Sequence, residues 1–178
     1  PSSEVLPKVS IIVPAYNEQV NAVKTINNLL KANYPDFEII FIDDGSKDDT
    51  YNIVLDAFEL NSSVKILTKV NGGKASALNY GISQATYDYV ICIDADTQLH
   101  SSAVSELMKK FASDEIVGVA GNVKVGNELN ILTKWQSIEY ITSQNFDRRA
   151  FDLLNCITVI PGAIGAFKKE SLINAGGF

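Results

Sequence analysis

Two hydrophobic patterns alternate along the chain. Short runs of consecutive apolar residues predict buried strands, and segments whose apolar residues recur every three or four positions predict amphipathic helices. The predicted strands are residues 9–13, 38–42, 64–67, 89–93 and 116–120; the helices between them are residues 18–32, a helix capped by Ser46 and Asp49, residues 74–84, and a helix capped by Ser101 or Ser102. This alternation predicts an α/β fold, with a mostly parallel sheet covered by helices on both faces (three-layer α/β/α).

The last third of the chain is predicted to contain further helices and strands. Residues 129–154 read as a long helix with Trp135, Ile138 and Phe146 inward, and residues 157–178 as a strand, a loop rich in proline and glycine, a short strand and a helix. A chain of 178 residues is long enough for one domain with a substantial core. We therefore expect a single domain over residues 1–178.

The strand at residues 89–93 ends abruptly in Asp94-Ala95-Asp96. Open α/β sheets bind their ligands at the carboxyl ends of the strands, where this pair would lie. Two neighbouring carboxylates repel each other, and a divalent cation shared with substrate phosphates removes that repulsion. A solvated turn is the alternative, because aspartate is common where strands end.

Three more strand ends carry polar residues that a parallel sheet would place beside Asp94 and Asp96. They are residues 14–18, 43–46 and 71–74. Gly73 and Lys74 begin a helix, where backbone N–H groups, the helix dipole and an ammonium suit a phosphate. The segment is neither a Walker P-loop nor a dinucleotide-binding G-x-G-x-x-G motif. Lys74 as a merely solvated residue is the alternative, although a cation is unfavourable at a helix N-terminus without an anion.

The charge of the chain limits its partners. A net charge of −6 and a pI near 4.8 argue against nucleic acid, which needs a basic surface. Cys92 and Cys156 lie far apart in apolar stretches, so we expect buried free thiols in a reducing compartment, with a disulfide as the alternative. The longest mainly apolar run, residues 156–167, is too short to span a bilayer. The first residue, Pro1, is not an initiator residue, so we expect that the N-terminus has been cut. No terminating segment follows the last helix, so we also expect a C-terminally truncated fragment of a longer protein.

Five segments, in this order and spacing, resemble the motifs of glycosyltransferase family 2, whose members have the nucleotide-binding GT-A fold. The segments are VSIIVPAYNE, FIDDGSKDDT, NGGKASALNYG, VICIDADTQL and PGAIGAFKKESLINAGGF. The third and fourth look most like the processive membrane-bound branch, which includes poly-N-acetylglucosamine, chitin, hyaluronan and cellulose synthases. The resemblance implies a nucleotide-binding half at residues 1–100 and the start of an acceptor-binding half at residues 101–178.

The resemblance also implies roles for individual residues. Pro14, Tyr16 and Glu18 would line the nucleotide pocket, with the Tyr16 ring stacked on uracil. Asp44 would accept the uracil N–H, Lys74 would contact the diphosphate, and Asp94 would face the sugar and ribose. Asp96 would hold Mg²⁺ or Mn²⁺. The loop under the acceptor sugar would comprise Gly162, Ala163, Ile164 and Gly165. Purely structural explanations remain for Pro14, which would then only end a strand, and for the two glycines as turn residues.

The activity implied by the resemblance is inverting transfer of a sugar, expected to be N-acetylglucosamine, from a UDP-sugar donor to a growing glycan. The alternatives are a polyprenyl-phosphate sugar transferase and a non-catalytic nucleotide-sugar-binding module. The family's acidic base motif would follow Phe178, so no catalytic base is assigned within the chain and we expect the chain alone to be inactive. The longer protein would be held in the cell membrane by segments absent from this chain, with this domain on the cytoplasmic side.

Overall fold

A six-stranded sheet organises the computed structural model, which describes residues 6–113, 115–121 and 164–178. All of them belong to one compact unit, residues 1–121 together with 162–178. The strands are β1 (Val9–Ala15), β2 (Phe37–Asp43), β3 (Val64–Thr68), β4 (Tyr89–Ile93), β5 (Gly118–Ala120) and β6 (Ile164–Lys168). Their order across the sheet is β3-β2-β1-β4-β6-β5.

The sheet is mostly parallel, as the sequence predicts. Strands β3, β2, β1 and β4 run parallel, whereas β6 lies antiparallel to both β4 and β5. From β1 the chain adds β2 and β3 on one side and then returns to place β4 on the other side of β1. The strand order therefore reverses between β1 and β4, and open α/β sheets bind ligands at such a switch point.

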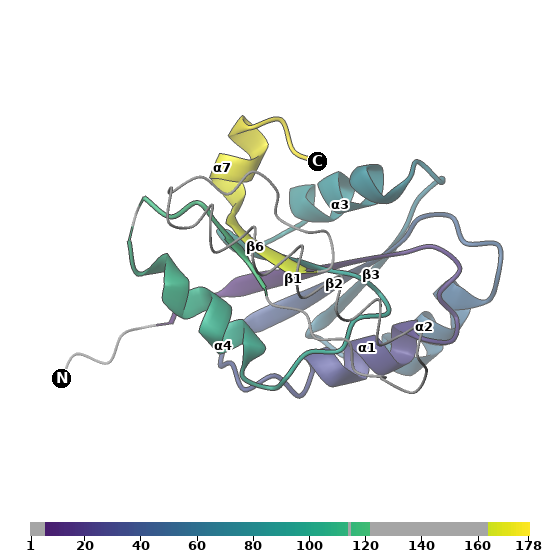
Figure 1. The fold of residues 1–178 in the computed structure, drawn as a ribbon. Coiled ribbons are helices and arrows are strands. Elements are labelled where there is room, and N and C mark those ends of the chain that lie inside the picture. Colours follow the sequence, from purple (N-terminus) through teal and green to yellow (C-terminus); the bar gives the residue numbers. More distant parts are fainter. Residues whose placement is uncertain (1–5, 114, 122–163) are drawn as a thin grey trace, which may run out of the picture. The chain divides into compact units, whose positions relative to one another are not determined.

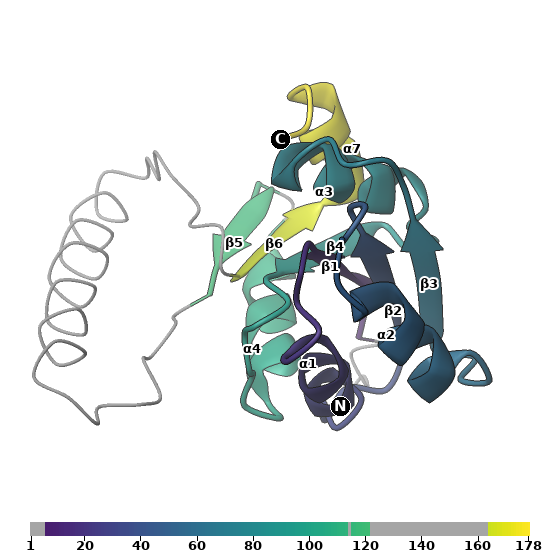
Figure 2. The same ribbon diagram turned by 90° about the vertical axis from the view of Figure 1, so that its right-hand side faces the viewer.

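Helices cover both faces of the sheet (Figures 1 and 2). Helices α1 (Ala22–Leu29), α2 (Thr50–Phe58) and α4 (Ala103–Met108) lie on one face, with a 3₁₀ helix (Lys109–Ala112) following α4; α3 (Lys74–Ser83) and α7 (Lys169–Asn174) lie on the other. Right-handed crossovers explain this division, because α1 and α2 connect strands added in one direction and α3 connects strands added in the other. The predicted three-layer α/β/α fold is confirmed.

The core lies between α3 and the centre of the sheet. Ile12, Ile42 and Val90 are fully buried there and pack with residues of α3. Gly81 permits this close approach, because a Cβ at that position would lie 2.6 Å from both Ile12 Cγ2 and Ile42 Cδ1. The pattern of apolar runs is strong because strands covered on both faces bury every side chain, as all residues of β1 do.

Strand β1 is longer than predicted, and it contains Pro14 instead of ending before it. Pro14 pairs with Ile42 of β2, but the pairing of β1 with β4 stops at Ile12 and Cys92. Pro14 therefore sits where β1 has a neighbour on one side only, and a strand tolerates a residue without an N–H group there.

Helix α1 begins four residues later than the predicted start at Glu18. The backbone N–H of Glu18 donates to Thr50 Oγ1 at 2.8 Å and that of Gln19 to Asp48 Oδ2 at 3.3 Å. These side chains hold the segment as a turn before the helix starts. Val20, an apolar residue within the predicted helix at 18–32, lies in this turn and is 67% exposed.

The predicted cap of α2 is wrong. Asp49, not Ser46, is the residue that precedes the helix, and the N–H of Thr50 donates to Asp48 Oδ1 at 3.0 Å. Ser46 Oγ instead accepts the N–H of Asn17 at 2.9 Å. The serine therefore joins the loops after β1 and β2, a contact that local sequence spacing does not reveal.

Several predictions lie outside the described residues: the helix at 129–154, the strand that begins at 157, and Cys156. Cys92 is a buried free thiol, as predicted. Among the described helices, none has the length and hydrophobicity needed to cross a membrane. The division into halves at residue 100 stays a prediction.

Candidate functional site

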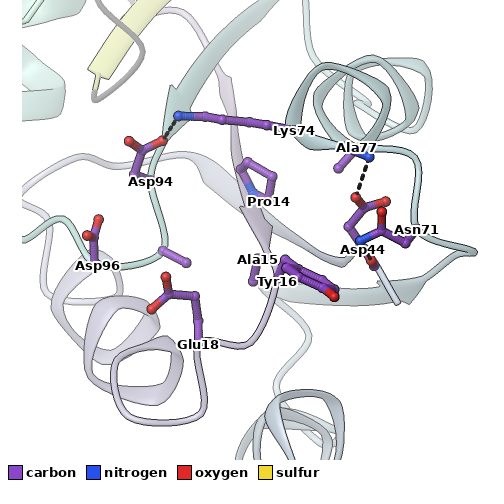
Figure 3. Close-up of a pocket in the computed structure, with 12 residues that line it drawn as sticks. Pro14, Ala15, Tyr16, Glu18, Asp44, Asn71, Lys74, Ala77, Asp94 and Asp96 are labelled. Atoms are coloured by element: carbon purple, nitrogen blue, oxygen red, sulfur yellow. Dashed lines mark hydrogen bonds and ion pairs between the residues drawn. The ribbon is translucent and has the colours of Figure 1, made fainter. Parts of the chain in front are cut away.

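A cavity of about 440 Å³ lies at the carboxyl ends of β1 and β4, at the switch point of the sheet (Figure 3). Its volume falls in the range of small-molecule sites, about 300–1,000 Å³. Every donor-side residue named from the sequence lines it: Pro14, Tyr16, Glu18, Asp44, Lys74, Asp94 and Asp96. Ala15, Asn71, Gly73, Ala77 and Ala95 complete the lining.

The two carboxylates of the Asp94-Ala95-Asp96 segment are held differently. Asp94 forms an ion pair with the ammonium of Lys74, which reaches across the cavity from the start of α3 (Figure 3). Asp96 is exposed, while Ala95 between them is buried. The ion pair brings together two of the groups expected to contact the donor. It also compensates the negative charge of Asp94.

Asp44 is buried and its carboxylate is already occupied by protein donors. Oδ1 accepts hydrogen bonds from Lys69 Nζ at 2.6 Å and the Gly72 N–H at 3.1 Å; Oδ2 accepts from the Gly73 N–H at 2.8 Å and from Gly72 at 3.3 Å. The Asn71 amide also donates to the backbone carbonyl of Asp44 at 2.8 Å. Asp44 therefore organises the loop that leads into α3.

These contacts change the interpretation of the glycine segment. The sequence predicts that backbone N–H groups at the Gly73-Lys74 helix start face a phosphate, but the Gly73 N–H donates to Asp44, as does the N–H of Gly72. Gly73 adopts a φ of +86°, which favours glycine and turns the chain into the helix. At this helix start, the group that reaches toward Asp94 is the side chain of Lys74.

Lys69 is the residue of this network that the sequence did not single out. It directly follows β3, as Asp44 directly follows β2, and the Lys69 N–H donates to the carbonyl of Asp43, the residue before Asp44, at 3.0 Å. A polar residue immediately after a strand was the available signal. It was missed because the predicted strand ended one residue short, at Leu67.

Neighbouring Asp43 has a separate, structural role. Its carboxylate accepts the Ser46 N–H at 3.3 Å and the Thr68 hydroxyl at 3.1 Å, which ties β2 to β3 and closes the turn after β2. The two adjacent aspartates are both buried, but only Asp44 lines the cavity.

Tyr16 and Glu18 form the β1 side of the cavity. The Tyr16 side chain is 42% exposed, and Figure 3 shows its ring along the cavity edge. Glu18 Oε2 accepts the Asn21 amide at 3.0 Å, which fixes the Glu18 carboxylate near the start of α1. An accessible ring at the edge of a pocket is suited to stacking on a base, and this role of Tyr16 stays a prediction.

Only part of the expected acceptor loop lies within the described residues. Gly162 and Ala163 lie outside the described residues. Ile164 and Gly165 are buried in β6, where they pair with Ile93 and Cys92, so for these two residues the assignment to a loop is wrong. Residues 164–168 form a strand because they pair with the edge of β4 that β1 leaves available. Their role toward an acceptor stays a prediction.

The donor atoms at the site suit a divalent cation that is shared with a ligand. No group of three or more histidine, cysteine, aspartate or glutamate side chains that could enclose a metal occurs among residues 6–113, 115–121 and 164–178. Mg²⁺ and Mn²⁺ prefer carboxylate oxygens, and Mg²⁺ is usually held by one or two carboxylates together with substrate phosphates. Asp94 and Asp96 fit a site of this kind, in which one or two carboxylates and the phosphates of a substrate share the ion.

Cys92, two residues before Asp94, does not add a nucleophile to the site. Burial raises the pKa of its thiol to about 12, partly offset by the nearby charge of Lys74. The thiolate that nucleophilic chemistry requires is therefore absent near neutral pH.

Comparison with solved structures defines the class of protein. The mannosyltransferase PcManGT from Pyrobaculum calidifontis, in complex with GDP-Man and Mn²⁺, is 25% identical with a TM-score of 0.75, over 97% of this chain and 47% of that one. Staphylococcus aureus TarS 1–349 in complex with UDP is 22% identical with a TM-score of 0.69, over 95% of this chain and 49% of that one. The fold is that of the GT-A glycosyltransferases.

The family follows from the sequence comparison. The model of glycosyl transferase family 2 matches residues 10–175, and the chain belongs to this family. The poly-β-1,6-N-acetyl-D-glucosamine synthase of Staphylococcus epidermidis is 39% identical over 170 residues, and that of Staphylococcus aureus strain COL is 36% identical over 169. These matches cover 94% of this chain and 41% of each relative. The resemblance noted in the sequence is confirmed.

Proposed function

We propose that this chain forms the donor-binding part of a UDP-N-acetylglucosamine-dependent glycosyltransferase that extends a glycan with inversion at the anomeric carbon. The observation that carries the proposal is the cavity at the β1–β4 switch point, which gathers Lys74, Asp94 and Asp96 in one place. The similarity to two staphylococcal poly-β-1,6-N-acetyl-D-glucosamine synthases supports the choice of sugar. The chain spans 41% of the length of these relatives, and we therefore propose the activity for a longer protein that contains this chain.

The diphosphate of the donor would bind between Lys74 and the two aspartates. Lys74 now pairs with Asp94, and an arriving diphosphate competes for the same ammonium. Asp94 and Asp96 would hold Mg²⁺ or Mn²⁺, which when bound neutralises charge on the departing diphosphate. Lys74 adds a second positive charge to the leaving group. Its long flexible stem lets the ammonium move from Asp94 to a phosphate oxygen.

The uracil would lie between the Tyr16 ring and Asp44. Each Asp44 oxygen already accepts two hydrogen-bond contacts. A uracil N3–H can therefore bond to the carboxylate only where one of the present donors makes room for it. The glycine N–H groups are fixed in the backbone, whereas Lys69 can shift on its flexible side chain. We therefore expect Lys69 to yield part of its contact with Asp44 when the base binds.

The acceptor side of the reaction is not assigned within the described residues. Inverting transfer needs a base within hydrogen-bond reach of the acceptor hydroxyl. Glu170 is the one carboxylate side chain of residues 164–178; it is exposed in the first turn of α7, where a negative charge is favoured by the helix dipole alone. We propose that the base lies elsewhere in the longer protein and that the 178-residue chain alone binds donor without transferring sugar. We also propose that the longer protein is attached to the membrane through segments outside this chain.

The test uses the native gene product that contains this sequence, supplied with UDP-N-acetylglucosamine and Mn²⁺. UDP release should require an N-acetylglucosamine oligosaccharide and should be lost in the Asp96→Asn variant. Release that depends on a polyprenyl phosphate instead would overturn the proposed acceptor class. Donor binding without release under any acceptor would identify a non-catalytic binding module.

A further inference from the structure

Helix α1 holds the segment that carries Asp94 and Asp96 through hydrogen bonds far apart in sequence. The hydroxyl of Thr25, a fully buried residue, donates to the Ala95 carbonyl at 2.7 Å. Three residues further along α1, the Asn28 amide makes two bonds to Leu99: Nδ2 donates to the carbonyl at 3.0 Å and Oδ1 accepts the N–H at 2.7 Å. The segment from Ala95 to Leu99 is thus held near both of its ends.

The Thr25 bond fixes the peptide unit between the two aspartates. The Ala95 carbonyl belongs to the peptide that leads into Asp96, so its direction sets where the Asp96 side chain starts. The carboxylate of Asp96 makes no hydrogen bond to any residue of the described ranges and is exposed. The position of the Asp96 carboxylate therefore depends on the backbone, and the hydroxyl of Thr25 holds that backbone through its hydrogen bond to the Ala95 carbonyl. The bond from the Thr97 N–H to the Asp94 carbonyl at 3.0 Å closes the turn around Ala95.

The hydroxyl of Thr25 serves a long-range contact instead of the usual local one. A threonine within a helix commonly bonds the carbonyl three or four residues earlier. Here it bonds a residue 70 positions away in sequence. For filling space in the buried position, valine has nearly the same shape and no polar group to satisfy. The hydroxyl of Thr25 is therefore explained by its hydrogen bond to the segment after β4 that carries Asp96.

Helix α1 also reaches the opposite side of the cavity. Its first residue, Ala22, donates its N–H to the Glu18 carbonyl at 2.9 Å, and Glu18 lines the same cavity as Asp94 and Asp96. One short helix thus connects the β1 side of the cavity to the carboxylate segment after β4. This continuity makes α1 a support for the geometry of the site.

We propose that Thr25 is a positioning residue for the metal- and donor-binding carboxylates Asp94 and Asp96, and that Asn28 supports the far end of the same segment. The proposal rests on the proposed function, since it assigns the segment's purpose to donor binding with a divalent cation. Some residues do not bind a metal themselves but orient its ligands through hydrogen bonds. Replacing such a residue typically lowers metal affinity or activity by about 10–100-fold.

The test compares Thr25→Val, which removes the hydroxyl and keeps the shape, with Thr25→Ser, which keeps the hydroxyl. UDP binding to the 178-residue chain is measured by calorimetry with Mn²⁺ and again with a chelator. Thr25→Val should weaken binding in Mn²⁺ by about tenfold or more, and should change binding in chelator by less than about twofold. Thr25→Ser should restore the affinity. Asn28→Ala should weaken binding in Mn²⁺ as well, whereas Asn27→Ala, on the exposed side of α1, serves as the matched control and should not.

Hydrogen exchange without any ligand gives a second readout. The amides of Thr97 and Leu99 should exchange faster in Thr25→Val and Asn28→Ala than in Asn27→Ala, with thermal melting confirming that each variant is folded. If Thr25→Val does not fold, Asn28→Ala decides the proposal. Unchanged exchange and unchanged affinity in the folded variants would overturn it, and so would an equal loss of affinity with and without Mn²⁺. Failure of the wild-type chain to bind UDP contradicts the proposed function instead, and the exchange rates then still decide whether Thr25 holds the segment.

Discussion

Lys69 and Asp44, 25 residues apart in the sequence, form an ion pair at the edge of the cavity, with Nζ 2.6 Å from Oδ1. The Asp44 side chain is 4% exposed and that of Lys69 is 20% exposed. A buried carboxylate needs such compensation, because desolvation opposes its charge. The pair explains how an aspartate can stay inside the protein beside a site that is expected to receive an anionic ligand.

Removing the positive charge of Lys69 should destabilise the protein. In Lys69→Met the stem remains and the ammonium is lost, so Asp44 keeps its backbone donors but loses its counter-charge. We expect the free energy of unfolding to fall by about 1–3 kcal/mol, the cost of leaving a buried polar group incompletely satisfied. Urea unfolding measures it. Lys65→Met on the exposed surface of β3 is the control, and an equal effect of the two substitutions would contradict a special role for Lys69.

Changing Asp44 should alter the choice of base. Uracil presents a donor at N3 and cytosine an acceptor, so the carboxylate favours UDP over CDP. Asp44→Asn should narrow this preference by about 1–3 kcal/mol, because an amide can meet either base. Competition binding of UDP and CDP measures the preference. Lys69→Met controls for loosening of the loop around Gly72 and Gly73; a preference that Asp44→Asn leaves unchanged would place base recognition elsewhere.

The sequence predicted the strands and the residues that line the cavity better than the long-range hydrogen bonds that hold those residues in place. Strand β4 was predicted with its observed bounds, because its apolar run is continuous and ends in Asp94. Since the loops that follow parallel strands share one edge, the prediction of a mostly parallel sheet was enough to place Asp44, Lys74 and Asp96 together. Their gathering around one cavity is observed; their individual roles stay predictions.

What the sequence did not predict depends on tertiary contacts. The late start of α1 follows from the hydrogen bonds of the preceding turn, such as the one from the Glu18 N–H to the Thr50 hydroxyl, 32 positions away. The roles of Lys69 and Thr25 likewise depend on partners in other strands and loops. Periodicity and capping rules describe neighbours within a few residues, so they carry no signal for such pairs.

Gly81 should not tolerate a methyl group. In an ordinary helix interior, alanine is more favourable than glycine by about 1 kcal/mol. Here the added Cβ would lie 2.6 Å from side-chain atoms of Ile12 and Ile42, and overpacking a core costs about 1–3 kcal/mol. Gly81→Ala should therefore lower the free energy of unfolding by up to about 2 kcal/mol in urea titrations. Ser83→Ala, near the end of α3, should change it by less than about 0.5 kcal/mol; a stabilised Gly81→Ala protein would mean that α3 lies further from the sheet.

Tyr34 should make stability fall at alkaline pH. Burial, with smaller contributions from Asp36 and Tyr89, raises the pKa of Tyr34 from 10.0 to about 12, and its hydroxyl donates to the Pro7 carbonyl. A raised pKa means that the folded chain keeps the phenol proton to higher pH than the unfolded chain. The stabilisation is complete below pH 10 and is lost as the pH rises through 12.

Urea unfolding between pH 9 and pH 12 checks this sign. Tyr34→Phe should flatten the decline over that range, by at most about 1.4 kcal/mol per pH unit. Tyr51→Phe, on α2, controls for the loss of a tyrosine hydroxyl elsewhere. The same slope in wild type and Tyr34→Phe would show that other groups cause the alkaline loss.

The most direct test of the site is calorimetric titration of UDP into the 178-residue chain, with Mn²⁺ and then with a chelator, for the wild type and Asp96→Asn. The wild type should bind UDP at least about tenfold more tightly with Mn²⁺, a difference of about 1.4 kcal/mol. Asp96→Asn should bind equally in both conditions, because the carboxylate expected to hold the ion is gone. Equal affinity of the wild type with and without Mn²⁺ would contradict the account of Asp94, Asp96 and Lys74 as a metal-assisted diphosphate site.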